Sequence, residues 1–221
     1  MRSTTSGRSR RGTPTDDGHG IPAHRLAGSG GDAADLTIGE GLAPGEVLEG
    51  VELEGCRFER SVLEGAVLRD CTFTDCVFTG CNLNRVDLSG SRFSDCTFVE
   101  CTALAVTWTR AAVAPLSARP WDLERCRLDL ASFQEGSIAG SRLVDCSLRE
   151  ADFGGADAQR VDWAGSDLSG AVFAGTDLRG ASLVGAVGYA FDPSENRVRG
   201  LRVEALGAAG LLAAMGLVVE D

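Results

Sequence analysis

The side chains of this chain that could support catalysis or metal binding are eight cysteines, two histidines and 32 acidic residues. Closely spaced cysteine and histidine bind zinc, and a histidine beside a serine or cysteine activates it as a nucleophile. Here the cysteines are separated by multiples of five residues without a CxxC pair, and His19 and His24 precede the regular part of the sequence. We therefore expect no metal, no cofactor and no enzymatic activity.

A repeat of five residues determines where these side chains lie. Leucine or phenylalanine recurs in one register, here called position i, from Leu48 to Leu183, and the residue at i−2 is small. A period of five fits neither a helix nor a plain strand, but it fits a chain that turns a corner in every pentapeptide and points i and i−2 inward. The expected core positions include Leu68, Phe73, Phe78, Leu83, Leu88, Phe93, Phe98 and Phe153.

Several segments carry the motif of a known family. Ala151-Asp152-Phe153 and Thr176-Asp177-Leu178 resemble the consensus A(D/N)LXX of the pentapeptide-repeat family, and Cys81-Asn82-Leu83 has its asparagine form. The resemblance implies an all-β fold, a right-handed quadrilateral parallel β-helix in which four pentapeptides close one coil. Residues 46–185 then hold 28 pentapeptides, or about seven coils.

The cysteines are expected to be packing residues. All eight occupy i−2, where a free buried cysteine behaves as a small hydrophobic side chain. Cys56, Cys76 and Cys96 would stack close enough for a disulfide by backbone distance, but parallel side chains in register fit disulfide torsion poorly. The full set is Cys56, Cys71, Cys76, Cys81, Cys96, Cys101, Cys126 and Cys146.

The register divides the chain into three parts. Residues 1–45 are rich in small and polar residues and are predicted to be a disordered tail, residues 46–185 form the β-helix, and residues 186–221 form a C-terminal cap and dimerisation segment. No apolar stretch follows Arg10-Arg11 as in a signal peptide, and the apolar stretch from Ala205 to Val219 is too short to span a bilayer. We expect a cytoplasmic protein that does not contact a membrane.

The C-terminal segment is expected to cap the last coil and to join two chains. A short helix should run from about Val203 to Gly216, followed by a strand at Leu217–Val219. The segment is similar to the C-terminal element of the Qnr and MfpA quinolone-resistance proteins, which joins two rods end to end, so the resemblance implies a homodimer. The dimerisation residues expected here are Leu211, Leu212, Met215, Leu217 and Val219.

One coil departs from the pattern. Between Val106 and Arg125 the bulky residues Leu116 and Trp121 stand at i−2, where the other coils have small side chains. A bulky residue in a small site must widen the coil or turn outward. The count of five residues continues through this stretch, so no inserted loop is expected.

Charge is expected to differ between the faces of the rod. Residues 46–185 contain 22 Asp or Glu against 13 Arg, and the chain has no Lys. A constant coil of twenty residues predicts one acidic face that carries Phe73, Phe93, Phe133 and Phe153 at position i. Its acidic residues are Glu52, Glu54, Asp75, Asp95, Glu135 and Asp152, against Arg92. The next face is expected to be mixed, with Arg57, Arg60, Arg119, Arg160 and Arg179 against Glu59, Glu100, Asp157 and Asp177.

An acidic rod of about the width of duplex DNA repels nucleic acid and is attracted to protein grooves that bind it. The resemblance to the Qnr and MfpA proteins implies DNA gyrase or topoisomerase IV as the partner, bound by a DNA mimic that protects the enzyme from quinolones or peptide toxins. The alternative is a general pentapeptide-repeat interaction scaffold without a topoisomerase role. Direct nucleic-acid binding is expected in neither case.

Overall fold

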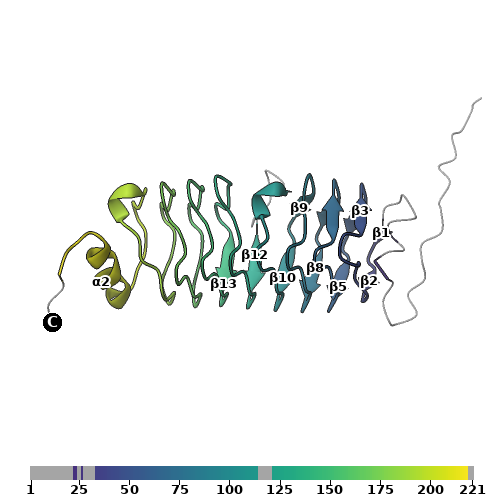
Figure 1. Cartoon of the computed structure of the whole chain (residues 1–221), viewed down its shortest axis with the longest axis horizontal. Coiled ribbons are helices and arrows are strands. Elements are labelled where there is room, and N and C mark those ends of the chain that lie inside the picture. Colours follow the sequence, from purple (N-terminus) through teal and green to yellow (C-terminus); the bar gives the residue numbers. More distant parts are fainter. Residues whose placement is uncertain (1–21, 24–25, 27–32, 114–120, 219–221) are drawn as a thin grey trace, which may run out of the picture.

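The described part of the chain is an elongated rod of stacked coils (Figure 1). The structure, a computed structural model, describes residues 22–23, 26, 33–113 and 121–218. The coils follow one another along the rod in sequence order, and the C-terminal helix lies at one end. No helix within these residues is long and apolar enough to cross a lipid bilayer. Most of the tail predicted to be disordered lies outside the described residues.

Parallel sheets run along the sides of the rod. Their strands have only two or three residues, because the chain turns a corner in every pentapeptide. The sheet orders are β1-β4-β7-β9-β11, β13-β12-β10-β8-β5-β2 and β3-β6. The strands are β1 (Ala33–Ala34), β2 (Thr37–Ile38), β3 (Val47–Glu49), β4 (Glu52–Glu54), β5 (Arg57–Glu59), β6 (Val67–Arg69), β7 (Thr72–Thr74), β8 (Val77–Thr79), β9 (Arg92–Ser94), β10 (Thr97–Val99), β11 (Ala112–Val113), β12 (Asp122–Glu124) and β13 (Arg142–Val144). Short 3-10 helices are η1 (Trp108–Arg110) and η2 (Pro193–Glu195).

The corners depend on residues at i+2 with positive φ. Glycine takes this conformation without strain, as at Gly80 (φ 62°). Larger residues also take it, including Leu130 (φ 62°), whose amide donates a hydrogen bond of 2.9 Å to the Arg149 carbonyl in the next coil. Hydrogen bonds between coils therefore hold a corner conformation that a non-glycine residue alone disfavours.

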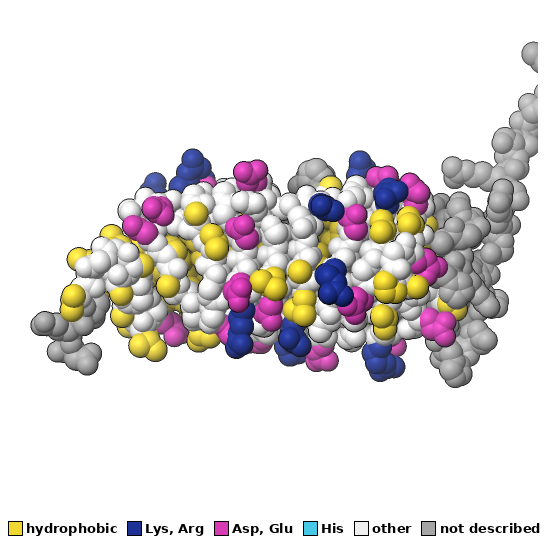
Figure 2. All heavy atoms as spheres, in the orientation of Figure 1, with side chains coloured by type: hydrophobic (Ala, Val, Ile, Leu, Met, Phe, Trp, Pro, Cys, Tyr) yellow, Lys and Arg dark blue, Asp and Glu magenta, His cyan; other side chains and the backbone are white. Residues whose placement is uncertain are grey.

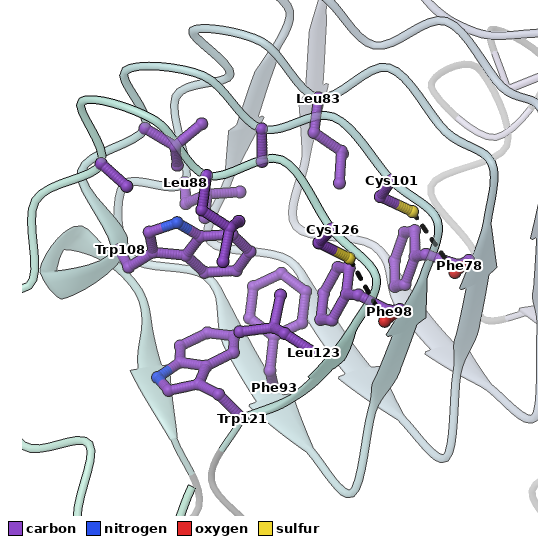
Figure 3. Packing of buried hydrophobic residues seen from close by; sticks show 14 of the residues in the cluster. Phe78, Leu83, Leu88, Phe93, Phe98, Cys101, Trp108, Trp121, Leu123 and Cys126 are labelled. Carbon is purple, nitrogen blue, oxygen red and sulfur yellow. Dashed lines mark hydrogen bonds between the residues drawn. The ribbon is translucent and has the colours of Figure 1, made fainter. Parts of the chain in front are cut away.

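The interior is a continuous stack of side chains from position i. All eight core residues named from the sequence are at most 3% exposed. The rings of Phe58, Phe78 and Phe98 lie one above the other, with centroids 4.4 and 4.6 Å apart. Trp108 and Trp121 pack against Phe98 and against each other, and their ring centroids are 4.8 Å apart (Figure 3). Position i thus fills the core in the way that the repeat predicts, and Trp121, at i−2, also lies inward in a coil that is wider than the others.

One coil of the stack contains 25 residues instead of twenty, which corrects the prediction of a constant twenty-residue coil. Phe78 pairs with Phe98, twenty residues on, but Phe98 pairs with Leu123, 25 residues on. The 25-residue step recurs between Thr107 and Ser132. One whole pentapeptide is therefore added between Val113 and Trp121, where residues 114–120 lie outside the described part of the chain.

The stack also extends beyond the predicted limits of residues 46 and 185. Ala33 in β1 pairs with Leu53 and Ile38 in β2 pairs with Phe58, so the stacking begins before residue 46. At the other end Ser182 pairs with Arg202. The predicted count of seven coils differs from the structure for these reasons and because one coil contains an added pentapeptide.

The first turn of the rod allows a direct test of this extension. A Cβ on Gly41 would lie 1.5 Å from the backbone oxygen of Val62, so we expect Gly41→Ala to detach residues 33–45 from the stack. Hydrogen exchange should then accelerate about tenfold or more at the amides of Asp35 and Leu42, which bond to the next coil. Glu40→Ala is the control, because Glu40 is the exposed neighbour of Gly41 and shortening its side chain adds no atom to the contact with Val62. Unchanged exchange in Gly41→Ala would contradict the docking of this segment.

Helix α2 (Ala205–Ala214) covers the last coil. It ends in a Schellman motif, because Gly216 has φ 80° and the amide of Leu217 donates to the Leu212 carbonyl at 3.0 Å. The strand predicted at Leu217–Val219 is not present in its described part, since Leu217 and Val218 have no strand pairing. Val219 lies outside the described residues.

Candidate protein-interaction surface

Five exposed acidic side chains lie on the sheet β1-β4-β7-β9-β11, and we call them the acidic patch. Strand pairing brings Ala34 beside Glu54, Glu54 beside Thr74 and Thr74 beside Ser94, so the patch extends over four successive coils. Neighbouring strands are about 4.8 Å apart, which spaces the carboxylates closely along the rod. The patch consists of Asp35, Glu52, Glu54, Asp75 and Asp95, and Arg92 lies on the same sheet.

Three members of the acidic patch carry no ion pair within the described residues, as is also true of exposed acids elsewhere such as Glu49, Glu59 and Glu150. Within residues 33–113 and 121–218, no arginine forms an ion pair with Glu52, Glu54 or Asp75. Some acids on the other sides of the rod pair with arginines from neighbouring coils, as Asp87 does with Arg110 at 3.3 Å. The patch therefore leaves negative charge available to a partner.

Asp177 shows what such pairing does to a carboxylate. The neighbouring Arg179, 2.6 Å away, lowers the pKa of Asp177 to about 2. Because this pKa is below that of an unfolded chain, the interaction stabilises the fold at neutral pH. Its contribution is lost as the pH falls from about 4 to about 2. Asp177 thus serves the rod, not a partner.

Two residues predicted for the acidic face lie elsewhere. Glu135 and Asp152 belong to the side that continues from β6, because Thr107 pairs with Ser132 and Ser132 with Asp152. The physical reason is the added pentapeptide, which moves each later pentapeptide one side further round the rod. Asp152 is also half-buried, and it accepts a hydrogen bond of 2.8 Å from the Gly154 amide. Its role is to hold a turn.

The predicted mixed face is corrected for the same reason. Asp157 pairs with Asp177, and Asp177 with Arg197, along the side that carries the acidic patch nearer the N-terminus. Arg160 and Arg179 lie on this side as well. The side therefore changes along its length from acidic, before the added pentapeptide, to mixed charge after it.

The eight cysteines are free and buried in the structure. Their thiols donate to backbone carbonyls of the preceding coil, as Cys101 does to Phe78 and Cys126 to Phe98, both at 3.4 Å (Figure 3). Burial raises the pKa of the Cys71 thiol, which disfavours the reactive thiolate. Among the described residues no group of three or more His, Cys, Asp or Glu is arranged to hold a metal ion.

Thiol titration should report this packing. We expect the native protein to react with far fewer than eight equivalents of a thiol reagent, because every cysteine is at most 2% exposed. Protein denatured without reductant should react with all eight. A smaller number after denaturation would reveal disulfides, and rapid reaction of native protein would contradict the burial.

The end of the rod at α2 is a second candidate surface. Figure 2 shows hydrophobic side chains gathered over this end. Of the predicted dimerisation residues, Leu211 is only 7% exposed because it packs on the rod of its own chain, so it is not available to a partner. Leu212, Met215 and Leu217 are exposed. Leu206, 89% exposed, was missed from the sequence because the repeat register ends before it.

Helix α2 approaches the rod closely at one point. A Cβ on Gly207 would lie 1.7 Å from the hydroxyl oxygen of Tyr189, so glycine is required for this contact. Glu204, just before the helix, accepts a hydrogen bond of 3.1 Å from the Gly185 amide. These contacts fix the base of the helix, whereas Leu206, Leu212 and Met215 remain exposed.

Two sequence models of pentapeptide repeats match most of the regular part of the chain. One describes a pentapeptide repeat region and matches residues 51–133, and the other describes eight copies of the repeat and matches residues 146–185. The chain belongs to the pentapeptide-repeat family. The stretch between the two matches still belongs to the stacked coils, because Ser137 within it pairs with Asp157. No curated protein sequence matches the chain.

Solved structures of other pentapeptide-repeat proteins resemble the rod at low sequence identity. A trypsin-treated variant of QnrB1, a plasmid-mediated fluoroquinolone resistance protein, is 20% identical over 87% of this chain and 100% of its own, with a TM-score of 0.49. HetL, involved in heterocyst differentiation regulation in Nostoc sp. strain PCC 7120, is 18% identical over 77% and 86%, with a TM-score of 0.44. A protein of the Arabidopsis thaliana thylakoid lumen is 16% identical over 79% and 76%, with a TM-score of 0.19. At these values the similarity indicates no partner or activity for this chain.

Proposed function

We propose that this pentapeptide-repeat protein is a non-enzymatic interaction protein whose acidic patch binds a positively charged groove of a DNA-binding protein. The observation that carries the proposal is the run of exposed carboxylates on four successive coils, of which Glu52, Glu54 and Asp75 have no ion pair within the described residues. Carboxylates spaced along a stiff rod attract the same basic groove that attracts phosphates.

The partner proposed for this surface is DNA gyrase or topoisomerase IV. This choice follows from the sequence resemblance to the Qnr and MfpA proteins, and it includes protection of the enzyme from quinolones or peptide toxins. The protein would then act in the cytoplasm beside its partner. The acidic patch supports contact with a positively charged groove that can receive a rod. The resemblance supports the identity of the enzyme.

We also propose that two chains associate through the C-terminal end. Leu206, Leu212 and Met215 leave apolar surface exposed around α2, although the helix already covers the last coil of its own chain. Apolar surface of this kind is typical of protein contacts. End-to-end association would place the two acidic patches toward the far ends of a longer rod.

A supercoiling assay tests the proposed partner. Purified protein is titrated into gyrase with and without a quinolone, and a rescue of supercoiling in the presence of the drug supports protection. Inhibition without rescue supports DNA mimicry alone. No effect would reject gyrase as the partner and favour the general scaffold.

A set of substitutions tests the acidic patch itself. Glu52→Gln, Glu54→Gln and Asp75→Asn together should weaken binding to the enzyme and reduce its dependence on salt, because the field at a contact is local and screened over about 10 Å. The matched control changes Glu49, Glu59 and Glu150 to glutamine, since these exposed acids lie on other sides of the rod. Equal losses from both sets would show that total charge matters and that the patch is not the contact.

A further inference from the structure

We propose that a hollow between helix α2 and the end of the rod binds a small organic cation, a primary alkylammonium ion. The hollow has a volume of about 240 Å³ and lies where α2 crosses the end of the rod (Figure 1). It is lined by residues 185–189 of the rod and by Glu204, Leu206, Gly207 and Gly210 in and beside α2. None of these residues belongs to the acidic patch, so the binding does not rest on the proposed function.

The hydroxyl of Tyr189 is the first group that points to a ligand. The Tyr189 side chain lines the hollow and is only 6% exposed, and its hydroxyl makes no hydrogen bond within the described residues. The hydroxyl oxygen lies against α2, since a Cβ on Gly207 would be 1.7 Å from it. Polar groups of side chains buried to this degree are normally hydrogen-bonded. A ligand that donates a hydrogen bond to this oxygen would supply the missing partner.

Glu204 supplies negative charge to the same hollow. Its Oε1 accepts a hydrogen bond of 3.1 Å from the Gly185 amide, which holds the carboxylate at the hollow. No arginine of residues 33–113 and 121–218 forms an ion pair with Glu204. Burial raises the pKa of Tyr189, and the charge of Glu204 raises it further, so the carboxylate acts on the phenol. The hollow therefore favours a cation over an anion.

A primary alkylammonium ion matches these groups. Its nitrogen carries three N–H donors, as a lysine ammonium does, so it can donate to both the Tyr189 hydroxyl oxygen and the Glu204 carboxylate. Its alkyl chain would lie against Val187 and Leu206, which line the hollow and are 58% and 89% exposed without a ligand. A neutral alcohol lacks the charge, and a carboxylate or phosphate would be repelled by Glu204. Charge and apolar chain together define the ligand class.

An occupied hollow would hold α2 on the rod. The ligand would contact both parts at once, and a ligand that binds only the docked arrangement stabilises that arrangement. Hydrogen exchange should then slow at the Ala208 amide, which donates to the Glu204 carbonyl at 2.9 Å in the first turn of α2. An effect of the ligand on association between chains at this end rests on the proposed dimer, whereas the binding itself does not.

Nuclear magnetic resonance of the full chain tests the site directly. The chain has one tyrosine, so protein with a ¹³C-labelled tyrosine ring gives a signal from the hollow alone. We expect n-butylammonium chloride at neutral pH to shift this signal in a saturable way, with a dissociation constant of about 1–10 mM for a ligand of this size. The isosteric n-butanol should bind about threefold or more weakly, and matched sodium chloride should give no saturable shift.

Three variants locate the binding. Glu204→Gln should weaken n-butylammonium binding about threefold or more, although its amide oxygen can still accept from the Gly185 amide. Glu195→Gln is the matched control, because Glu195 is an exposed acid of η2 outside the hollow, and it should bind as the unmodified protein does. Gly210→Leu should abolish binding by filling the hollow, and its Cβ would clear the nearest atom, the Tyr189 carbonyl oxygen, by 3.7 Å.

Three results would overturn the proposal. The first is equal affinity for n-butylammonium and n-butanol, or no saturable shift, in the unmodified protein, a comparison that does not depend on the folding of any variant. The second is unchanged affinity in Glu204→Gln. The third is a dissociation constant that changes with protein concentration, which would mean that the signal reports association between chains. None of these measurements involves a topoisomerase, so their failure leaves the proposed function to its own assay.

Discussion

Replacing Phe78 by alanine is expected to lower the free energy of unfolding by about 3–5 kcal/mol. The Phe78 ring stacks on Phe58 at 4.4 Å and on Phe98 at 4.6 Å, and it meets Phe73 at 5.8 Å in a tilted contact. Alanine would remove the middle of this stack. The parallel strands are held by hydrogen bonds between coils, so the walls cannot easily collapse into the space.

Denaturant unfolding followed by circular dichroism measures this loss. The control is Val62→Ala, because Val62 is 53% exposed and lies outside the stack, and it should change stability by less than about 0.5 kcal/mol. In a rod of repeats each coil contacts chiefly its neighbours, so hydrogen exchange should locate the loss in the coils around Phe78. A cost below about 1 kcal/mol would mean that the aromatic stack is not a principal source of stability.

Leu206→Asp is expected to abolish the proposed dimer. Leu206 is 89% exposed in the single chain, so aspartate should not disturb folding there, but it would place an unpaired charge in an apolar contact between chains. Truncating or charging a central contact residue commonly costs 2 kcal/mol or more, or roughly thirtyfold in affinity. Sedimentation velocity at micromolar concentration distinguishes a dimer from a 23.0 kDa monomer.

The matched control for this variant is Leu130→Asp. Leu130 is also an exposed leucine, at 56%, but it lies at a corner in the middle of the rod, far from α2 along the stack. Its positive φ suits aspartate better than leucine. We expect this variant to remain dimeric. If the unmodified protein is a monomer under these conditions, or if both variants dissociate, the C-terminal contact is refuted.

The repeat in the sequence determined the fold and the interior. Because i and i−2 recur every five residues, they specify which side chains point inward whatever the neighbouring coils do, and the cysteines, Phe73 and Phe153 are all buried accordingly. The alanine- and leucine-rich stretch that ends at Gly216 separately predicted a helix after the last coil, and α2 is present there. These features depend on local geometry and on hydrophobic burial, which the sequence records directly.

The surface was decided by the tertiary structure. A whole added pentapeptide leaves the five-residue count unchanged. Leu116 and Trp121 therefore mark an irregular coil in the sequence without indicating that Phe98 pairs with Leu123 instead of with Ala118. The consequence is that Glu135 and Asp152 lie apart from Glu54 and Asp75. In the same way, only the docking of α2 buries Leu211 and exposes Leu206. Which side of the rod a residue occupies depends on the number of residues in each coil, and stacking between coils sets that number.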